Sequence, residues 1–389
     1  ERTVEPAPAE GVRIIYKSRG LNSKKIMTIR MVNDREATKD SSGGNLPHSF
    51  ARATIFQPII TVVSTSKFVD VRSRDEIEED PTMGVLYRNS RVLAFGHNVG
   101  VDWEEDASSI RTEHIPGFEV PKMIPDESLK KHIPSMEELS DSSTIDKALG
   151  SLQGLLDANR KWIEEAENAL SKDIESGIID GSNEVMQKAI QDNLTNAKSS
   201  LGRMEEGINT LKENQMAREA FILSNKAIQI SQEGPTGPAR VDEFRWFPFQ
   251  IAFQLLNLNG IVSTEPEDKH WNDRDKILDL AWFPTGGGKT EAYLGLISMT
   301  GFFRRLRYPE EEKTPSVHAI MRYTLRLLTI DQSERLVRLV TAMNMVASEH
   351  PSPSVNGAHP FRVGMWVGKT TSPNQLKGSR DRIDAKSLP

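Results

Sequence analysis

Residues 283–295, FPTGGGKTEAYLG, constrain the fold of this chain more than any other stretch. The triple glycine stands between an apolar run and a predicted helix that opens with Lys289 and Thr290. In such a turn, backbone N–H groups can point inward around a phosphate, because no Cβ blocks the approach. The helix N-terminus adds further donors and a partial positive charge. The stretch therefore predicts a phosphate-binding loop. Its cradle residues are Thr285, Gly286, Gly287 and Gly288.

The two residues after the glycines have distinct expected roles. Lys289 is expected to reach the β- and γ-phosphates of ATP, and the Thr290 hydroxyl is expected to bind Mg²⁺. These two residues are the candidate catalytic residues. The full pattern G-x-x-x-x-G-K-[ST] is not met, because Phe283 stands at its first glycine position. The alternative interpretation is a glycine-rich turn with an incidental lysine.

The residues around the loop alternate between predicted strands and predicted helices. The predicted strands are 277–282, 316–323 and 361–368, and the predicted helices are 290–306 and 325–349. This β-α-β-α-β order predicts a parallel sheet covered by helices. The Pro- and Gly-rich segment 234–240 marks the start of this domain, which we assign to residues 234–389.

Residues 125–233 predict a helical bundle, because apolar residues recur there at steps of three and four. The three stripes are Ile145, Leu149, Leu152, Leu156, Ile163, Ala166 and Leu170; then Ile190, Leu194, Ala197, Leu201, Met204, Ile208 and Leu211; then Ala217, Ala220, Phe221, Ser224, Ala227 and Ile228. The links between them are short, which favours an intramolecular core over a coiled-coil partner surface.

Residues 1–124 predict a β-rich domain, with a strand pair at 85–87 and 92–95 among its apolar clusters. Within 96–103, His97 and Asp102 are candidate metal ligands, but two ligands are too few for a site. We therefore interpret this stretch as a turn whose Trp103 fills a small core.

The composition limits the classes of protein that remain. The chain has 389 residues, a net charge of −6 and no cysteine. It has no apolar run long enough for a membrane span and no secretory signal, so we expect a cytoplasmic protein without disulfides. The acidic balance confines any DNA contact to a local basic face. The chain begins without methionine, so we expect a fragment or a processed form.

The loop without its leading glycine resembles motif I of superfamily 2 helicases and translocases. Upstream, RWFPFQIAF resembles the Q motif of that superfamily, in which glutamine binds the adenine edge and an aromatic ring packs on the base. The resemblance assigns these roles to Gln250 and Phe247. It also implies a RecA-like P-loop domain, which would be incomplete in this chain. Taken alone, the stretch is more safely interpreted as the start of an amphipathic helix with an apolar patch.

Two downstream stretches resemble DNA-contacting motifs of the same superfamily. In MRYTLRLLTIDQSERL, which resembles motif Ia, Thr324 and Arg326 are the implied contacts to the sugar-phosphate backbone, whereas Arg335 and Arg338 are interpreted as solvated. The segment beginning GKTTSPN resembles the motif Ib region, with Lys369 and Thr370 as candidate contacts. Residues 360–389 hold six Lys or Arg and two Asp, a local net of +4. A solvated basic tail is the alternative.

Several stretches are together similar to the DrmA family, the helicase-like proteins of the bacterial DISARM antiphage system. These are FPTGGGKTEAYLGL, MRYTLRLLT, WVGKTTSPN, RMEEGINTLKENQMAREAFILSNKAI and YRNSRVLAFGHNVGVDW. The resemblance implies a longer protein with a second RecA-like domain, ATP and Mg²⁺ as cofactors, a DrmB-like partner and phage DNA as target. Such DNA would be single-stranded or carry a single-stranded overhang.

The same resemblance leaves parts of a motor unaccounted for. We find no acidic Walker B box, no SAT motif and no arginine finger in the sequence. We therefore expect this segment alone to bind nucleotide weakly and not to hydrolyse it. Two other functions stay open: a non-catalytic, nucleotide-sensing scaffold for DNA or a partner, and a small-molecule P-loop kinase.

Overall fold

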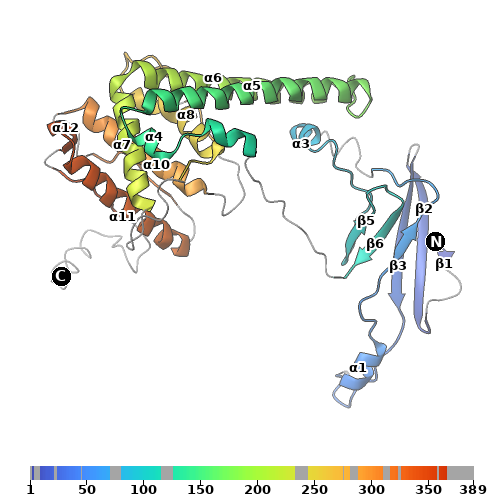
Figure 1. Ribbon diagram of the computed structural model, residues 1–389. Helices are drawn as coiled ribbons and strands as arrows, with labels where there is room; N and C mark the ends of the chain where they lie inside the picture. The colour runs from blue at the N-terminus through green and yellow to red at the C-terminus, as the bar shows by residue number, and fades with distance from the viewer. Residues whose placement is uncertain are drawn as a thin grey trace. The chain divides into compact units, whose positions relative to one another are not determined.

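The computed structural model describes residues 2–3, 9–21, 24–44, 46–70, 80–114, 126–232, 244–274, 276–280, 288–309, 316–322, 326–356 and 359–365. The fold is mixed α/β, with antiparallel sheets near the N-terminus followed by a helical assembly (Figure 1). The chain divides into two compact units, Glu1–Val120 and Pro121–Pro389. The helices predicted at 125–233 and those around the glycine-rich loop therefore belong to one unit.

The first sheet has the order β1-β2-β3. Strand β2 (Val12–Leu21) pairs antiparallel with β3 (Lys24–Asn33) over ten residues on each side, from Val12 opposite Asn33 to Leu21 opposite Lys24. The two-residue strand β1 (Arg2–Thr3) adds to the free edge of β2. Helix α1 (Pro47–Ala53) follows, and the Asn33 side chain donates to the Ala53 carbonyl at 2.7 Å.

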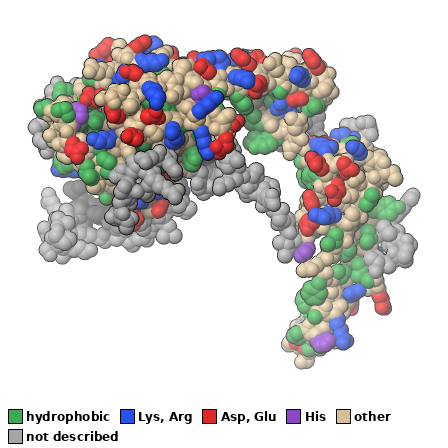
Figure 2. Space-filling view, viewed as in Figure 1, with side chains coloured by type: hydrophobic (Ala, Val, Ile, Leu, Met, Phe, Trp, Pro, Cys, Tyr) green, Lys and Arg blue, Asp and Glu red, His purple; other side chains and the backbone are tan. Residues whose placement is uncertain are grey.

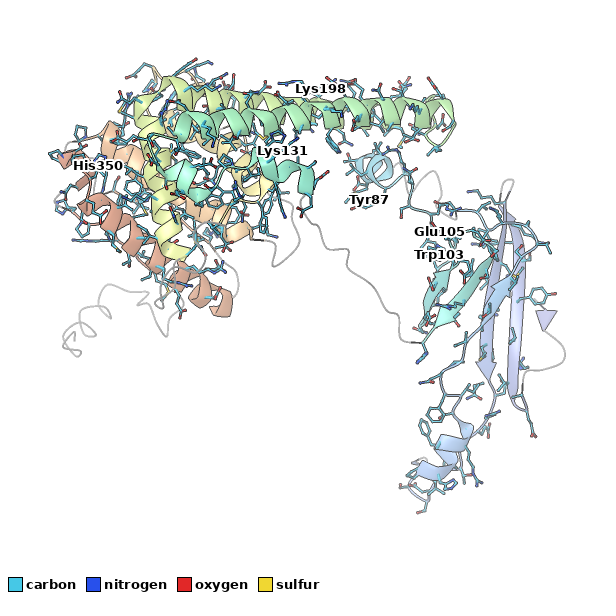
Figure 3. The ribbon with its side chains drawn as sticks, viewed as in Figure 1. Tyr87, Trp103, Glu105, Lys131, Lys198 and His350 are labelled. Atoms are coloured by element: carbon cyan, nitrogen blue, oxygen red, sulfur yellow. The ribbon has the colours of Figure 1, made fainter. Side chains whose placement is uncertain are left out.

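The second sheet has the order β4-β6-β5, all antiparallel: β4 is Thr61–Val63, β5 is Gly100–Trp103 and β6 is Ser109–Glu113. Trp103, at the end of β5 (Figure 3), packs against a small core of Leu93, Ala107 and Ile110. The interpretation of Trp103 as a core residue is thus confirmed. Asp102 pairs with Arg111 at 2.9 Å, and among the described residues no three side chains gather as metal ligands.

The strand pair predicted at 85–87 and 92–95 is wrong. Residues 81–86 form helix α3 (Pro81–Leu86), and residues 92–95 form no ladder. The helix begins at Pro81, whose fixed φ suits the first turn. The side chain of Asp80 caps it by accepting the Met83 N–H at 3.1 Å. The sequence contained these helix-start signals, but the prediction gave more weight to the apolar residues at 85–87.

The second unit begins with η1 (Glu127–His132) and α4 (Met136–Ser140), followed by three long helices: α5 (Ile145–Glu175), α6 (Glu184–Glu213) and α7 (Gln215–Gln232). All three predicted apolar stripes lie on these helices, and most of their residues are buried. The break predicted near Gly177 separates α5 from α6. Asn183 then starts α6 by accepting the N–H groups of Val185 and Met186.

One apolar core joins these helices to α8 (Pro248–Val262), α10 (Lys289–Arg307) and α11 (Arg326–Ser348). Short helices α9 (Trp271–Arg274) and α12 (Pro353–Asn356) lie at its margin. Phe221 and Phe302 are among its fully buried side chains. At Gly207 of α6 a Cβ would collide with the Leu255 carbonyl, so the backbones of α6 and α8 touch there. The predicted helices 290–306 and 325–349 are confirmed as α10 and α11.

The strands predicted around the glycine-rich loop are not formed in the described residues. Residues 277–280, 316–322 and 361–365 have no ladder partner among the described parts of the chain. Leu278 was expected in a buried strand, but it is 96% exposed. A strand of a parallel sheet needs a neighbouring strand and cover on both faces, and the sequence of one strand cannot supply them. The predicted helices are formed, whereas the parallel sheet is not found among the described residues and stays a prediction.

Arg305 ties the C-terminal end of α10 to α12 and to the residues after it. Its guanidinium donates to the carbonyls of Val355 at 2.8 Å and His359 at 2.6 Å, and it lies 3.4 Å from the centre of the Phe361 ring. Burial lowers the pKa of Arg305 to about 10, since a charged group loses hydration there. The carbonyl and ring contacts offset that loss.

Candidate nucleotide-binding site

The N-terminal ends of α8 and α10 meet at Gly288. Gly288 caps α10 in the left-handed conformation, with φ 85° and ψ 26°. A Cβ on this residue would lie 2.8 Å from Nε2 of Gln250. Both the backbone angle and the space therefore require glycine. Of the predicted cradle, Gly288 is the described residue; Thr285, Gly286 and Gly287 lie outside the described residues.

Lys289 and Thr290 are the first two residues of α10 and are half-buried. Their backbone N–H groups belong to the first turn, where an α-helix has no internal acceptors. The helix dipole adds positive potential at the same place. A triphosphate with Mg²⁺ matches the groups gathered here: an ammonium group, first-turn amides and a hydroxyl. The positions of Lys289 and Thr290 agree with the roles expected for them, and the roles remain predictions.

Gln250 links the two helix ends. Its side chain is only 4% exposed; Oε1 accepts the Phe247 N–H at 2.8 Å, and Nε2 donates to the Gly288 carbonyl at 2.7 Å. An amide has a second lone pair and a second N–H, so adenine binding by Gln250 stays a prediction. What the geometry adds is a direct tie between α8 and the residue that starts α10.

Phe247 is the N-cap residue of α8, and its ring is 47% exposed. It lies 6.3 Å from the Phe249 ring at an angle of 14°, a stacked arrangement. An exposed aromatic face next to the loop is the chemistry that packing on a base needs. The sequence-based role of Phe247 is consistent with this position and remains untested.

Glu291 places a carboxylate in the first turn of α10, close to where a phosphate would bind. Arg335 of α11 pairs with it, Nη1 to Oε1 at 2.8 Å. This pairing offsets a negative charge that would otherwise repel phosphate. The expectation that Arg335 is solvated is wrong, because its guanidinium pairs with Glu291, which is 44 residues earlier in the chain. Arg338, by contrast, is exposed as expected.

The helical bundle holds the segment that leads into the loop. Arg203 of α6 binds both oxygens of Asp279, at 2.7 and 2.6 Å, and donates to the Leu256 carbonyl at 2.9 Å. The bonds to Asp279 raise the pKa of Arg203 above its usual value. Ser224 of α7 also donates to the Gly295 carbonyl of α10 at 3.1 Å. Both α6 and α7 thus position the two sides of the loop.

Sequence reasoning missed Arg203, although a signal was present. Asp279 is the one carboxylate in ILDLAW, residues 277–282, which was taken as a buried strand. A carboxylate that leaves water needs a cation or several donors. That requirement predicts a basic partner, but only the packing of α6 identifies it as Arg203.

The predicted DNA contacts are mostly outside the described residues. This applies to Thr324, Lys369 and Thr370. Arg326 is the first residue of α11, and its side chain is not described. The predicted contacts therefore remain predictions.

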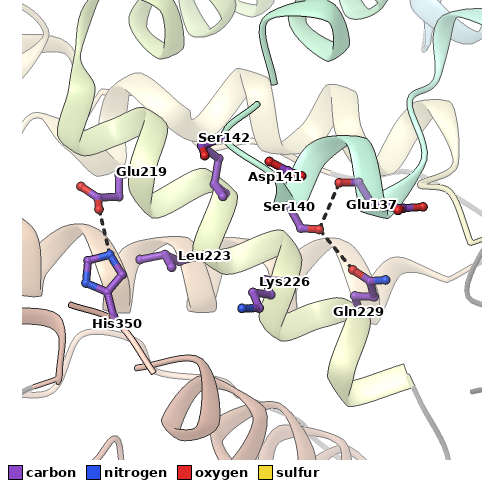
Figure 4. A pocket seen from close by; sticks show the side chains of 10 residues that line it. Glu137, Ser140, Asp141, Ser142, Glu219, Leu223, Lys226, Gln229 and His350 are labelled. Carbon is purple, nitrogen blue, oxygen red and sulfur yellow. Dashed lines mark hydrogen bonds and ion pairs between the residues drawn. The ribbon is translucent and has the colours of Figure 1, made fainter. Parts of the chain in front are cut away.

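A cavity of about 500 Å³ lies elsewhere, between α4, α7 and the residue just after α11 (Figure 4). His350 bonds to Glu219 there at 2.8 Å, and Ser140 donates to Gln229 at 3.2 Å. Three carboxylates line it against the single lysine Lys226, so its charge is unfavourable for a phosphate. The other acidic residues are Glu137 and Asp141.

No protein-family model matches the chain. The DISARM protein DrmA of Bacillus paralicheniformis is 31% identical over 323 residues. Over the matched residues, this chain is similar to that DrmA. The match covers 75% of this chain and 26% of the relative, so the chain spans about a quarter of the length of that DrmA. The resemblance expected from the glycine-rich loop and the helical stretches is supported at this level. No described helix is both long and apolar enough for a membrane crossing.

Proposed function

We propose that this chain is the nucleotide-binding part of an ATP-dependent DNA motor, a superfamily 2 translocase or helicase of a DISARM-type antiphage system. The observation that carries the proposal is the N-terminal end of α10. There a left-handed Gly288 starts a helix whose first residues are Lys289 and Thr290, and Gln250 ties that glycine to α8. The similarity to DrmA supports the antiphage setting.

In this proposal, the residues of the chain bind and orient ATP. Lys289 places its ammonium group on the outer phosphates, and the Thr290 hydroxyl and the amides of the first turn hold the nucleotide against α10. Mg²⁺, when bound with ATP, neutralises phosphate charge. Phe247 packs on adenine, and Arg335 holds Glu291 away from the phosphates. A RecA-like sheet, a second RecA-like domain, phage DNA and a DrmB-like partner are further parts of the proposal.

The test is ATP turnover by the full-length protein with and without DNA. We expect stimulation by DNA, and we expect Lys289→Ala to remove turnover at unchanged thermal stability. Lys276→Ala is the matched control, since that exposed lysine pairs with nearby Asp273 at 3.4 Å. It should keep full activity.

Two other results would each replace the motor with another function. Nucleotide binding without DNA-dependent turnover would assign a sensing scaffold. The exposed segments 277–280 and 316–322, which have no ladder partner among the described residues, favour this second candidate. Phosphoryl transfer to a metabolite would assign a kinase.

A further inference from the structure

The β2–β3 hairpin is strongly basic within an acidic chain. Residues 12–33 contain no Asp or Glu, while the whole chain has a net charge of −6. The cations of the hairpin are Arg13, Lys17, Arg19, Lys24, Lys25 and Arg30. Elsewhere the two signs are mixed, as the helical unit in Figure 2 illustrates. A local excess of one sign raises the local concentration of oppositely charged ligands.

The register places five of these six cations on one face. In an antiparallel pair, residues directly opposite each other share a face, and alternate residues along a strand do too. Ile15 stands opposite Arg30, and Leu21 opposite Lys24. The odd-numbered residues of β2 and their partners therefore form one face. Its cations are Arg13, Lys17, Arg19, Lys24 and Arg30.

The opposite face of the hairpin is largely apolar. It carries Val12, Ile14, Tyr16, Ile29 and Met31, all buried or half-buried, together with exposed Met27 and Lys25. All five cations of the other face are exposed. The basic face also carries half-buried Ile15, Ile26 and Val32, so what distinguishes it is its five exposed cations.

Some of the cations already have partners inside the unit. Arg13 pairs with Asp34, at 2.5 and 3.0 Å, and Lys24 donates to the Asp70 carbonyl at 2.8 Å. Both contacts are exposed, where an ion pair contributes little and exchanges readily. Lys17 and Arg19 stand two residues apart on the same face, roughly 7 Å along the strand. They are the best residues on which to test this face.

We propose that the basic face of the β2–β3 hairpin binds the phosphate backbone of duplex DNA. The distance from Arg13 to Arg19 is about 20 Å along β2, which matches the rise of roughly six base pairs. Single-strand binders combine cations with aromatic rings on which bases stack. The one aromatic of the hairpin, Tyr16, is on the opposite face, so the contacts are to phosphates alone. The choice of DNA rests on the proposed motor function.

The test measures the affinity of the whole chain for a fluorescent duplex across about 50 to 200 mM salt. The variant is Lys17→Gln/Arg19→Gln. Each phosphate contact contributes about 0.9 to the slope of log K against log salt, so the slope should fall by about 1.8. If the two contacts act by counterion release alone, affinity at about 0.1 M salt should weaken about 60-fold.

Two controls accompany this variant. Lys25→Gln removes one charge from the opposite face, directly beside Lys24 in sequence. Lys161→Gln/Lys172→Gln removes two charges from α5, where both lysines are exposed. Each should leave the slope and the affinity unchanged. If the hairpin variant behaves like these controls while staying folded, the proposal is wrong.

Further measurements distinguish this proposal from the motor function and from other ligands for the same face. Lys289→Ala should keep duplex affinity even though it removes ATP turnover, so the hairpin and the motor can fail independently. A single-stranded oligonucleotide of the same length identifies the form of DNA. An effect of the hairpin variant on the single strand alone would overturn the duplex assignment. Loss of binding to phosphatidylserine vesicles with unchanged duplex affinity would assign the face to membranes instead.

Discussion

Replacing Arg203 by alanine tests whether the bundle supports the nucleotide loop. The change removes two hydrogen bonds to Asp279 and one to the Leu256 carbonyl. It leaves the Asp279 carboxylate without its cation. The Asp279 side chain is 18% exposed and the Arg203 side chain is 24% exposed, so the pair is largely shielded from water. Breaking a fully buried pair costs roughly 3–5 kcal/mol, and breaking an exposed pair costs at most about 1 kcal/mol.

The intermediate burial of this pair sets the expected magnitude. We expect Arg203→Ala to lower the free energy of unfolding by about 2–3 kcal/mol. For a unit of this size, that loss corresponds to a decrease in Tm of roughly 4–12 °C. Nucleotide affinity should fall as well, because Asp279 stands four residues before Phe283, at the entry to the loop. Arg203→Lys keeps the charge but loses the two-pronged contact, so an intermediate loss is expected.

The assay is a double-mutant cycle in urea, with a fluorescent ATP analogue as the second measurement. Arg203→Ala and Asp279→Ala together should cost less than the sum of the two single changes, with a coupling of about 1–3 kcal/mol. Arg160→Ala is the control. It breaks a pair with Glu205 between α5 and α6 and a pair with Asp157, and the Arg160 and Glu205 side chains are 43% and 33% exposed. An equal loss for Arg203→Ala and Arg160→Ala would refute the reasoning.

Three other changes have defined outcomes. Gly288→Ala should cost roughly 2 kcal/mol and abolish nucleotide binding, because φ is 85° and the new Cβ would meet Gln250; wild-type affinity in a nucleotide titration would contradict this. Gly207→Ala should destabilise the protein more than Gly288→Ala, since its Cβ would collide with the Leu255 carbonyl rather than with a side chain. Urea denaturation should therefore give Gly207→Ala the lower free energy of unfolding. Burial, followed by Arg304 and Arg305, lowers the pKa of His318. The unfolded chain therefore binds a proton first, and stability should fall as pH drops below about 6.5, an effect that His318→Gln should remove from the urea midpoint.

The long helices could be predicted from the sequence because their signal is local. Apolar residues at steps of three and four, such as Leu149 and Leu152 of α5, define a buried face without reference to any other element. The same holds for the glycine-rich turn, since a left-handed backbone such as that of Gly288 favours glycine for local steric reasons. These features follow from the geometry of a few neighbouring residues.

The strands around the loop could not be predicted in this way. Apolar runs such as residues 277–280 lack a ladder among the described residues, and Leu280 is exposed there. A strand is stabilised by partners that are distant in the sequence, so the composition of one segment does not decide its state. The apolar residues near Val85 formed a helix because Asp80 and Pro81 supplied a local helix start.

The sequence by itself determined the bundle helices, the turn that starts α10 and the places of Lys289 and Thr290, because each depends on short-range geometry. Only the tertiary structure decided that Arg203 holds Asp279, that Arg335 neutralises Glu291, and that one hairpin face gathers the cations. Those contacts join residues up to 76 positions apart. No local sequence pattern encodes such long-range contacts, since they depend on how the helices and strands pack together in the folded protein.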